Sequence, residues 1–410
     1  MEAKLAYGRN AFLNLDLPEE KLFASYGPSA GEPLDDIVAA VAAAMLDPIG
    51  YPPLTQAVVS GDCIAIPIDP AVPQPQLLIA GLIGPLCEAG IAPADITVLS
   101  TSPVNDIQED PRNELPEAIS KHVRLVIHDP HDRDELGFLA TSADNQPIYL
   151  NRAIQDADVV FPIGCLRPQS SLAYHGIHTV LFPTYADAAT MERYQKASNE
   201  DSDVARRRRA KESKEAAWLL GLNATIQVIP GGGNSILQIL TGDPDKVEET
   251  GLHRVEAVHQ HEVDQQAQLA VVAIDGDASQ QTWENLARAV NAGLSAVVEE
   301  GIVVVCSEIN TLPTADSALK QLAREEDVPS ASHTIRGQHS ADAVAAAQLL
   351  AAREQANLFL LSQLEEDVVS ELGFAPVEEA ADIDRLCNRC ESCILISSAQ
   401  FADTHAVNAS

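Results

Sequence analysis

Polar side chains with chemical potential are concentrated in one short stretch between two apolar segments. They comprise imidazole, guanidinium, hydroxyl and amide groups, and the imidazoles can exchange protons or bind a metal. The stretch contains Arg167, Gln169, Ser170, Ser171, Tyr174, His175 and His178. This pattern favours a small-molecule site, with a polar surface loop as the alternative.

Two more polar side chains directly follow predicted strands. Asp69 comes after the apolar run 63–68, and Thr101 comes after the run 96–100, with a helix predicted at 76–89 between them. A strand, a crossover helix and a strand in succession predict a parallel sheet, and such sheets bind ligands beyond the carboxyl ends of their strands. The alternative for Asp69 is a helix cap or a turn.

The polar stretch itself begins at the end of a third predicted strand, residues 159–163. We therefore expect the polar residues after these strands to share one ligand cleft. The expected lining residues are Asp69, Thr101, Gln169, Tyr174, His175 and His178.

Metal binding is supported only weakly by the residue types. His175 and His178 are three residues apart, a spacing that polar loop residues also show. Cys387, Cys390 and Cys393 form a CxxCxxC pattern, but a cluster-binding run needs a fourth thiolate, and none follows. The three cysteines are therefore interpreted as ordinary thiols. We predict that the protein binds no metal ion, and His175 and His178 are the weak alternative candidates for metal ligands.

The composition limits the possible binding partners of the protein and its expected cellular compartment. The 410 residues carry 60 acidic and 26 basic side chains, a formal net charge of −34. Such a surface repels phosphate backbones and anionic lipid, which argues against nucleic-acid and membrane partners. An odd number of cysteines, seven, together with the lack of an export signal or a membrane-length apolar run, predicts a cytoplasmic protein with reduced thiols. A small-molecule acid is the partner that remains.

The order of elements predicts an α/β fold of two domains with largely parallel sheets and a ligand cleft between them. The polar run 263–268 marks the boundary. We predict an N-terminal domain of residues 1–262, completed by residues 391–410, and a smaller C-terminal α/β domain of residues 267–388. We also expect a strand at 179–182 and helical structure over 366–385.

Ordered blocks of sequence are similar to those of a known family. In chain order they read AYGRNAFLNLDLPEE, DPIGYPPL, GDCIAIPIDPAVPQP, LCEAGIAPADITVLST, NRAIQDADVVFPIG and SILQILTGDPDKVEETG. These blocks resemble the lactate racemase family over about residues 5–310. The resemblance implies a two-domain α/β enzyme that uses a nickel-pincer nucleotide to racemise or epimerise 2-hydroxy acids.

The resemblance also implies chemical roles for six positions, and each position carries a different residue here. Val72 stands where the family has the arginine that holds the substrate carboxylate. Val104 and Gln169 stand where it has two catalytic histidines. The other three positions are the cofactor lysine, the nickel-binding histidine and a substrate-side lysine, which correspond to Thr179, Gln195 and Asn291.

These replacements predict a change of function. Inverting a carbon that bears a hydroxyl group needs a base on each face, and neither valine nor glutamine exchanges a proton near neutral pH. We therefore expect a small-molecule-binding or regulatory homologue that has lost racemase chemistry and carries no cofactor. Two alternatives stay open. One is another enzyme acting on a small hydroxy or sugar acid through Asp69, His175 or His178, and the other is an active isomerase that retains the nickel-pincer nucleotide under a different register.

Overall fold

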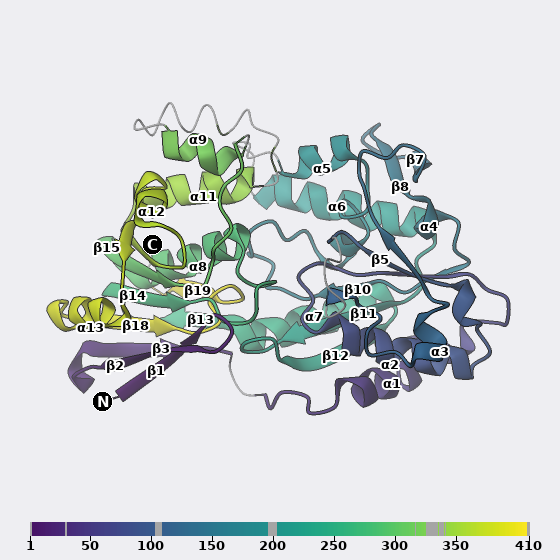
Figure 1. The fold of residues 1–410 in the computed structure, drawn as a ribbon, viewed down its shortest axis with the longest axis horizontal. Helices are drawn as coiled ribbons and strands as arrows, with labels where there is room; N and C mark the ends of the chain where they lie inside the picture. Colours follow the sequence, from purple (N-terminus) through teal and green to yellow (C-terminus); the bar gives the residue numbers. More distant parts are fainter. Residues whose placement is uncertain are drawn as a thin grey trace.

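The computed structural model describes residues 2–28, 31–102, 109–195, 203–315, 317–324, 335, 340 and 342–407. Helices and mostly parallel sheets form two groups that lie side by side (Figure 1). The predicted α/β fold class is confirmed. Within the described residues, no helix combines the length and the apolar character needed to cross a membrane.

A parallel four-stranded sheet with the order β6-β5-β4-β9 forms the base of the first group. Its central strand, β4, is buried along its whole length because helices cover both faces. Ile64 and Ile66 face the core formed with the first two helices, whereas Ala65 faces the core that contains Tyr185. The strands are β4 (Ile64–Pro67), β5 (Ile96–Ser100), β6 (Arg124–Ile127) and β9 (Val159–Val160).

A three-stranded sheet continues this group. β10 (Ile163–Cys165) pairs in parallel with β11 (Thr225–Pro230), which forms an antiparallel hairpin with β12 (Ile236–Gly242). An isolated bridge between Ile68 and Ile163 joins the two sheets. The two sheets therefore present the ends of β4, β5 and β10 to one region. A separate hairpin, β7 (Leu136–Thr141) and β8 (Pro147–Asn151), lies beside them.

Helices cover these sheets on both sides, as Figure 1 shows. They are α1 (Ile37–Leu46), α2 (Pro75–Glu88), α3 (Glu117–Ser120), α4 (Arg152–Gln155), α5 (Ala188–Gln195), α6 (Asp203–Leu220) and α7 (Pro244–His259). The short 3₁₀ helices are η1 (Glu19–Lys21), η2 (Leu54–Gln56), η3 (Pro93–Asp95) and η5 (Ile177–Val180).

The second group is built on a six-stranded parallel sheet with the order β17-β16-β15-β14-β18-β3. Side chains of a strand alternate between faces, so β14 contributes Ala270 and Val272 to one core and Leu269 and Val271 to the other. Its strands are β3 (Leu22–Tyr26), β14 (Ala267–Ala273), β15 (Val297–Cys306), β16 (Asn357–Leu361), β17 (Ala375–Val377) and β18 (Cys393–Ile396).

Helices on one face and a hairpin with a helix on the other cover this sheet. The first face packs against α8 (Trp283–Ala296), α9 (Ala318–Arg324) and α11 (Ala343–Arg353). The opposite face packs against the hairpin of β1 (Glu2–Tyr7) and β2 (Ala11–Asp16) and against α13 (Ala380–Arg389). The edge near β17 carries α12 (Glu366–Glu371).

The two ends of the chain meet in the six-stranded sheet. β18 lies between β14 and the N-terminal strand β3 and is parallel to both. β13 (Gln260–Val263) pairs with the last strand, β19 (Asp403–Ala406). The closing segment thus joins the same sheet as β14, together with an N-terminal strand. The division into domains 1–262 with 391–410 and 267–388 stays a prediction.

Two local expectations are wrong. Residues 177–180 form the 3₁₀ helix η5 where we expected a strand to begin at residue 179, because Leu181 and Phe182 donate back to His178 O instead of to a neighbouring strand. The segment 366–385 is not one helical stretch. Gly373, with φ +83°, ends the helical part, and β17 follows before the next helix begins.

Candidate functional site

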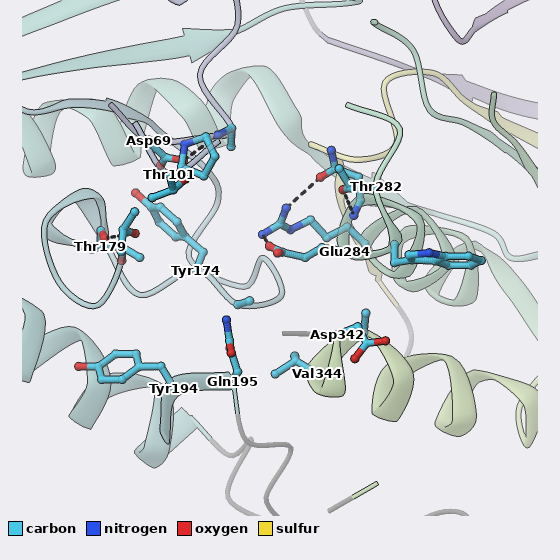
Figure 2. Close-up of a pocket in the computed structure, with 18 of the residues that line it drawn as sticks. Asp69, Thr101, Tyr174, Thr179, Tyr194, Gln195, Thr282, Glu284, Asp342 and Val344 are labelled. Carbon is cyan, nitrogen blue, oxygen red and sulfur yellow. Dashed lines mark hydrogen bonds and ion pairs between the residues drawn. The ribbon is translucent and has the colours of Figure 1, made fainter. Parts of the chain in front are cut away.

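A pocket of about 610 Å³ lies between the two groups of elements (Figure 2). One wall is formed by residues just after β4, β5 and β10, which are the carboxyl ends of parallel strands. Other walls come from η5 and α5 and from the N-terminal ends of α8 and α11. This position is the one where parallel α/β sheets place their ligands.

Four of the six expected cleft residues line this pocket. They are Asp69, Thr101, Tyr174 and His175. Figure 2 shows Asp69, Thr101 and Tyr174 on the same side of the pocket. That these side chains bind a ligand stays a prediction.

The other two expected residues, Gln169 and His178, are absent from this lining. Gln169 is exposed to solvent. His178 is 5% exposed, and its ring lies near Asp245 and Glu248 of α7. His178 points away from the pocket because it lies in the 3₁₀ helix η5, in which consecutive side chains point about 120° apart. Thr179 therefore lines the pocket while its neighbour His178 does not.

The six family positions are distributed unevenly. Thr179 and Gln195 line the pocket. Val72 is buried in the core beneath it, and Asn291 is exposed and accepts a hydrogen bond from Gln348 at 2.9 Å. Gln169 is exposed, as stated above, and Val104 lies outside the described residues.

Arg288 of α8 is a pocket residue that the sequence analysis missed. Its guanidinium is 9% exposed and donates to Leu172 O from Nε at 3.0 Å and from Nη2 at 2.8 Å. It also donates to Asn285 Oδ1 at 2.9 Å and pairs with Glu284. Burial and the nearby Arg167 lower the pKa of Arg288 to about 10, which leaves it charged at neutral pH. A sequence signal existed, because apolar residues flank this arginine on both sides in the run Leu-Ala-Arg-Ala-Val of α8.

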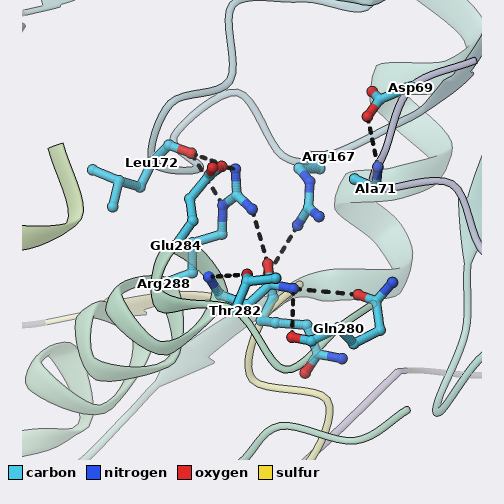
Figure 3. A network of polar contacts seen from close by, with 10 residues as sticks. Asp69, Ala71, Arg167, Leu172, Gln280, Thr282, Glu284 and Arg288 are labelled. Carbon is cyan, nitrogen blue, oxygen red and sulfur yellow. Dashed lines mark hydrogen bonds and ion pairs between the residues drawn. The ribbon is translucent and has the colours of Figure 1, made fainter. Parts of the chain in front are cut away.

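Arg167 lies beside Arg288 in Figure 3. Its side chain is almost fully buried, and its Nη1 donates to Gln400 O at 3.0 Å. The guanidinium also lies 4.9 Å from the centre of the Phe401 ring. Its Nη2 is buried and has no hydrogen-bond partner among the described residues. The pocket wall thus contains two adjacent cations and one unused donor.

Asp69 supplies a carboxyl group on the side of Arg167 that faces away from Arg288 (Figure 3). Its Oδ1 accepts a hydrogen bond from Ala71 N at 2.8 Å. Burial raises the pKa of Asp69, while that hydrogen bond and the positive charge of Arg167 act in the opposite direction. The protonation state of Asp69 therefore depends on the balance between its burial and these contacts.

His175 is the imidazole among the described lining residues. Burial lowers the pKa of His175 to about 3, and the nearby Arg209 and Arg206 act in the same direction. Its ring packs edge-on against Tyr194 at 5.5 Å between ring centres. The imidazole is consequently neutral at physiological pH and a weak base. Burial also raises the pKa of Tyr174, so that its phenol stays protonated.

The three C-terminal cysteines are not part of the close ligand cluster found among the described residues. All three are free and buried. Cys393 Sγ lies 3.6 Å from the backbone carbonyl oxygen of Cys387. Over the described ranges, the cluster of three or more close ligand atoms that we find contains His178, Asp245 and Glu248 and no cysteine.

The fold and the pocket define an α/β protein with a pocket between its two groups of elements. Residues 7–205 match the family model of the lactate racemase N-terminal domain. This match covers nearly half of the chain and, together with the fold, supports membership of the lactate racemase family, in agreement with the resemblance seen in the ordered sequence blocks.

Two solved structures are similar in fold. The lactate racemase apoprotein from Thermoanaerobacterium thermosaccharolyticum has a TM-score of 0.80 at 16% identity, covering 99% of this chain and 100% of its own. A protein from Thermotoga maritima, solved as a structural genomics target, has a TM-score of 0.65 at 13% identity, with coverages of 92% and 99%. No curated protein matches the sequence.

Proposed function

We propose that this pocket binds a small organic acid and that the chain no longer performs nickel-pincer racemisation. The observation that carries the proposal is the buried Nη2 of Arg167, which has no hydrogen-bond partner in the described structure. A buried guanidinium N–H without an acceptor is costly, and a bound carboxylate supplies that acceptor.

The neighbouring groups favour an anion over a neutral ligand. Arg288 remains charged but is paired with Glu284, so the positive charge available to a ligand at this wall comes mainly from Arg167. Guanidinium groups match the planar geometry of a carboxylate, which Val72 at the family's clamp position cannot pair with. The anion-binding role therefore passes from position 72 to Arg167, with Arg288 in support.

The pocket does not fit the nickel-pincer nucleotide as the family resemblance anchors it. Thr179 offers a hydroxyl group, which already donates to Gly176 O at 2.8 Å, and no amine. Gln195 offers a neutral amide in place of an imidazole. His175 is close to these positions, but Arg206 and Arg209 act on it electrostatically and oppose a cation there.

Proton exchange is also poorly supported. Two bases on opposite faces of a substrate carbon are needed, each contributing on the order of a hundredfold or more. His175 is too weak a base near neutral pH. Asp69 is then the remaining candidate base on the wall formed by the residues just after β4, β5 and β10. A pocket that holds an acid without inverting it agrees with this set of groups.

The proposal is tested by calorimetric titration of the purified chain with a panel of small 2-hydroxy acids and sugar acids. We expect saturable binding of at least one acid. Loss of one charge-assisted hydrogen bond, as in Arg167→Gln, should weaken that binding by roughly tenfold or more. Arg167→Lys keeps the charge but loses the planar fork, and should give an intermediate affinity.

The matched control is Arg254→Gln. Arg254 is exposed on α7, donates to Gln238, and is not part of the pocket lining. Its substitution should leave affinity unchanged. Equal binding by the Arg167→Gln variant and the parent chain, with both folded by circular dichroism, would contradict the proposal.

A second candidate function is catalysis on a small hydroxy or sugar acid, and one observation favours it. Asp69, whose pKa is raised, lies in the same pocket as His175. The test is to co-express the chain with cofactor-making enzymes, weigh the intact protein and assay the interconversion of D- and L-lactate. We expect no adduct and no turnover. An adduct together with turnover well above the uncatalysed rate would establish the enzyme instead.

A further inference from the structure

A cluster of three ligand side chains lies behind the pocket wall. It consists of His178 from η5 and of Asp245 and Glu248 from the first turns of α7. One ligand atom of each residue lies within 4.8 Å of the others. None of the three lines the pocket between the two groups of elements, which is proposed to bind an acid and is called the acid pocket below. The cluster is therefore a separate feature of the molecule.

His178 is the unusual member of this cluster. The residue is 5% exposed, and neither Nδ1 nor Nε2 has a hydrogen-bond partner in the part of the chain that the structure describes. Burial lowers the pKa of His178 to about 4, which keeps the imidazole neutral. A neutral imidazole with a free nitrogen is the form that coordinates metal ions. Leaving it unpaired in the interior costs free energy.

The two carboxylates differ in their surroundings. Asp245 is exposed and pairs with Lys214 at 2.7 Å between Oδ1 and Nζ. Glu248 is half-buried and accepts a hydrogen bond from the backbone N–H of Ile177, one residue before the histidine. Glu248 is thereby held against the turn that carries His178, and Asp245 approaches from the solvent side.

We propose that His178, Asp245 and Glu248 form a binding site for a divalent transition-metal cation, with Zn²⁺ as the best fit. One imidazole and two carboxylates suit Zn²⁺, and three protein ligands leave a fourth position open to water. Mg²⁺ prefers oxygen ligands alone and should bind weakly. The site differs from the family's nickel position, which falls on Gln195 in this chain.

Small movements bring the ligands into coordination geometry. Ligand atoms around a tetrahedral zinc ion lie about 3.4 Å apart, given bonds of roughly 2.0–2.2 Å. The present separations of up to 4.8 Å close when exposed side chains rotate. Asp245 and Lys214 are 68% and 51% exposed, so the ammonium group can move into solvent as the cation enters. A bound ion would join α7 to the turn before Thr179 and so fix one wall of the acid pocket.

The site is tested on the full-length chain after chelator treatment and dialysis, by titration with Zn²⁺ alone and, separately, with Co²⁺ as a spectroscopic probe. We expect one ion per chain and Co²⁺ absorption typical of tetrahedral coordination. His178→Ala and Asp245→Asn should each weaken Zn²⁺ binding by at least about tenfold. Mutating residues that only hydrogen-bond to metal ligands already lowers metal affinity by ~10–100-fold. Asp245 is exposed, so its variant tests the site without threatening the core.

A third variant separates the metal site from general damage. Lys214→Gln removes the ammonium group that competes for Asp245, so Zn²⁺ should bind several-fold more tightly. His122→Gln changes an exposed histidine away from the cluster and should bind Zn²⁺ like the parent. The proposal is overturned if Zn²⁺ does not bind saturably, or if binding is insensitive to His178→Ala and Asp245→Asn. Acid binding in the pocket plays no part in either readout, so the two proposals can fail independently.

Discussion

His259 shows how one buried side chain couples the fold to pH. The residue is 1% exposed at the end of α7, and its Nε2 lies 2.9 Å from Pro230 O. Its ring packs against Phe401 at 5.6 Å between ring centres. Burial lowers the pKa of His259 to about 4, against an ordinary value near 6.5.

This shift predicts acid sensitivity. The imidazole binds a proton at pH 6.5 in the unfolded chain, but in the folded chain only near pH 4. Unfolding therefore takes up a proton in this window, and stability is lost as the pH falls from about 6.5 to 4, by roughly 3 kcal/mol for this group at full extent. His259→Gln should be less stable at pH 7 but lose less on acidification, as measured by urea unfolding across that range.

The control for this prediction is His122→Gln, because His122 is exposed. Its unfolding free energy should follow the parent chain at every pH. A His259→Gln variant with the same pH slope as the parent would show that burial of this imidazole is not what couples stability to protonation.

At this scale the sequence predicted part of the pocket lining. Asp69 and Thr101 were predictable because each follows an apolar strand, and the carboxyl ends of parallel strands meet at one edge. The role of Arg167 was not, since Gln400 and Phe401, which hold its guanidinium, come more than 230 residues later. Local sequence carries no record of such a contact.

Asp275 joins three elements at the end of β14. Its Oδ2 accepts hydrogen bonds from Gly233 N and from Ser398 Oγ, each at 2.8 Å, and its Oδ1 accepts one from Gln400 Nε2 at 3.0 Å. Gly233 belongs to the turn between β11 and β12, and Ser398 and Gln400 belong to the segment between β18 and β19. One carboxylate therefore connects both groups of elements and supports the residue that holds Arg167.

Replacing this carboxylate should be costly. All three partners are donors, so the amide NH₂ of Asp275→Asn would face a donor and leave buried groups unsatisfied. We expect a loss of about 1–3 kcal/mol in the free energy of unfolding, measured by denaturant titration. Faster hydrogen exchange at the Gly233 amide should accompany it.

A second aspartate provides the comparison. Asp158 also accepts a backbone hydrogen bond, from Cys63 N at 2.9 Å, but it is exposed to solvent. Asp158→Asn should change stability much less, because water can replace the lost contact. If the two variants lose equal stability, the buried network around Asp275 does not have the importance assigned to it.

Element types were predictable where the apolar period was clear, and they failed where a local break overrode it. The run Thr179–Phe182 has a strand-like composition, but its backbone bonds close within the turn and form η5. The segment 366–385 has helical spacing, yet Gly373 and Pro376 interrupt it and β17 pairs with β16. The first break depends on local backbone hydrogen bonds that composition does not reveal. The second could have been read from the sequence, because Gly373 and Pro376 both disfavour a continuous helix.

The net charge of the chain affects the stability of the whole molecule. A formal net charge of −34 is spread over a chain in which acidic residues exceed basic ones by 60 to 26. Repulsion among the exposed carboxylates opposes the compact state, because unfolding separates them.

Screening should therefore stabilise this protein. The screening length falls from ~30 Å at 0.01 M salt to ~8 Å at 0.15 M, which removes most long-range repulsion between surface carboxylates. We expect the denaturation midpoint in urea to rise over this range of NaCl, and equally with KCl or choline chloride if screening alone acts. Reversing exposed acidic residues, as in Glu299→Lys with Glu391→Lys, lowers the net negative charge and should make the salt dependence shallower. A midpoint that falls with added salt, or an increase specific to one cation, would mean that ion pairs or a bound cation control stability instead of general repulsion.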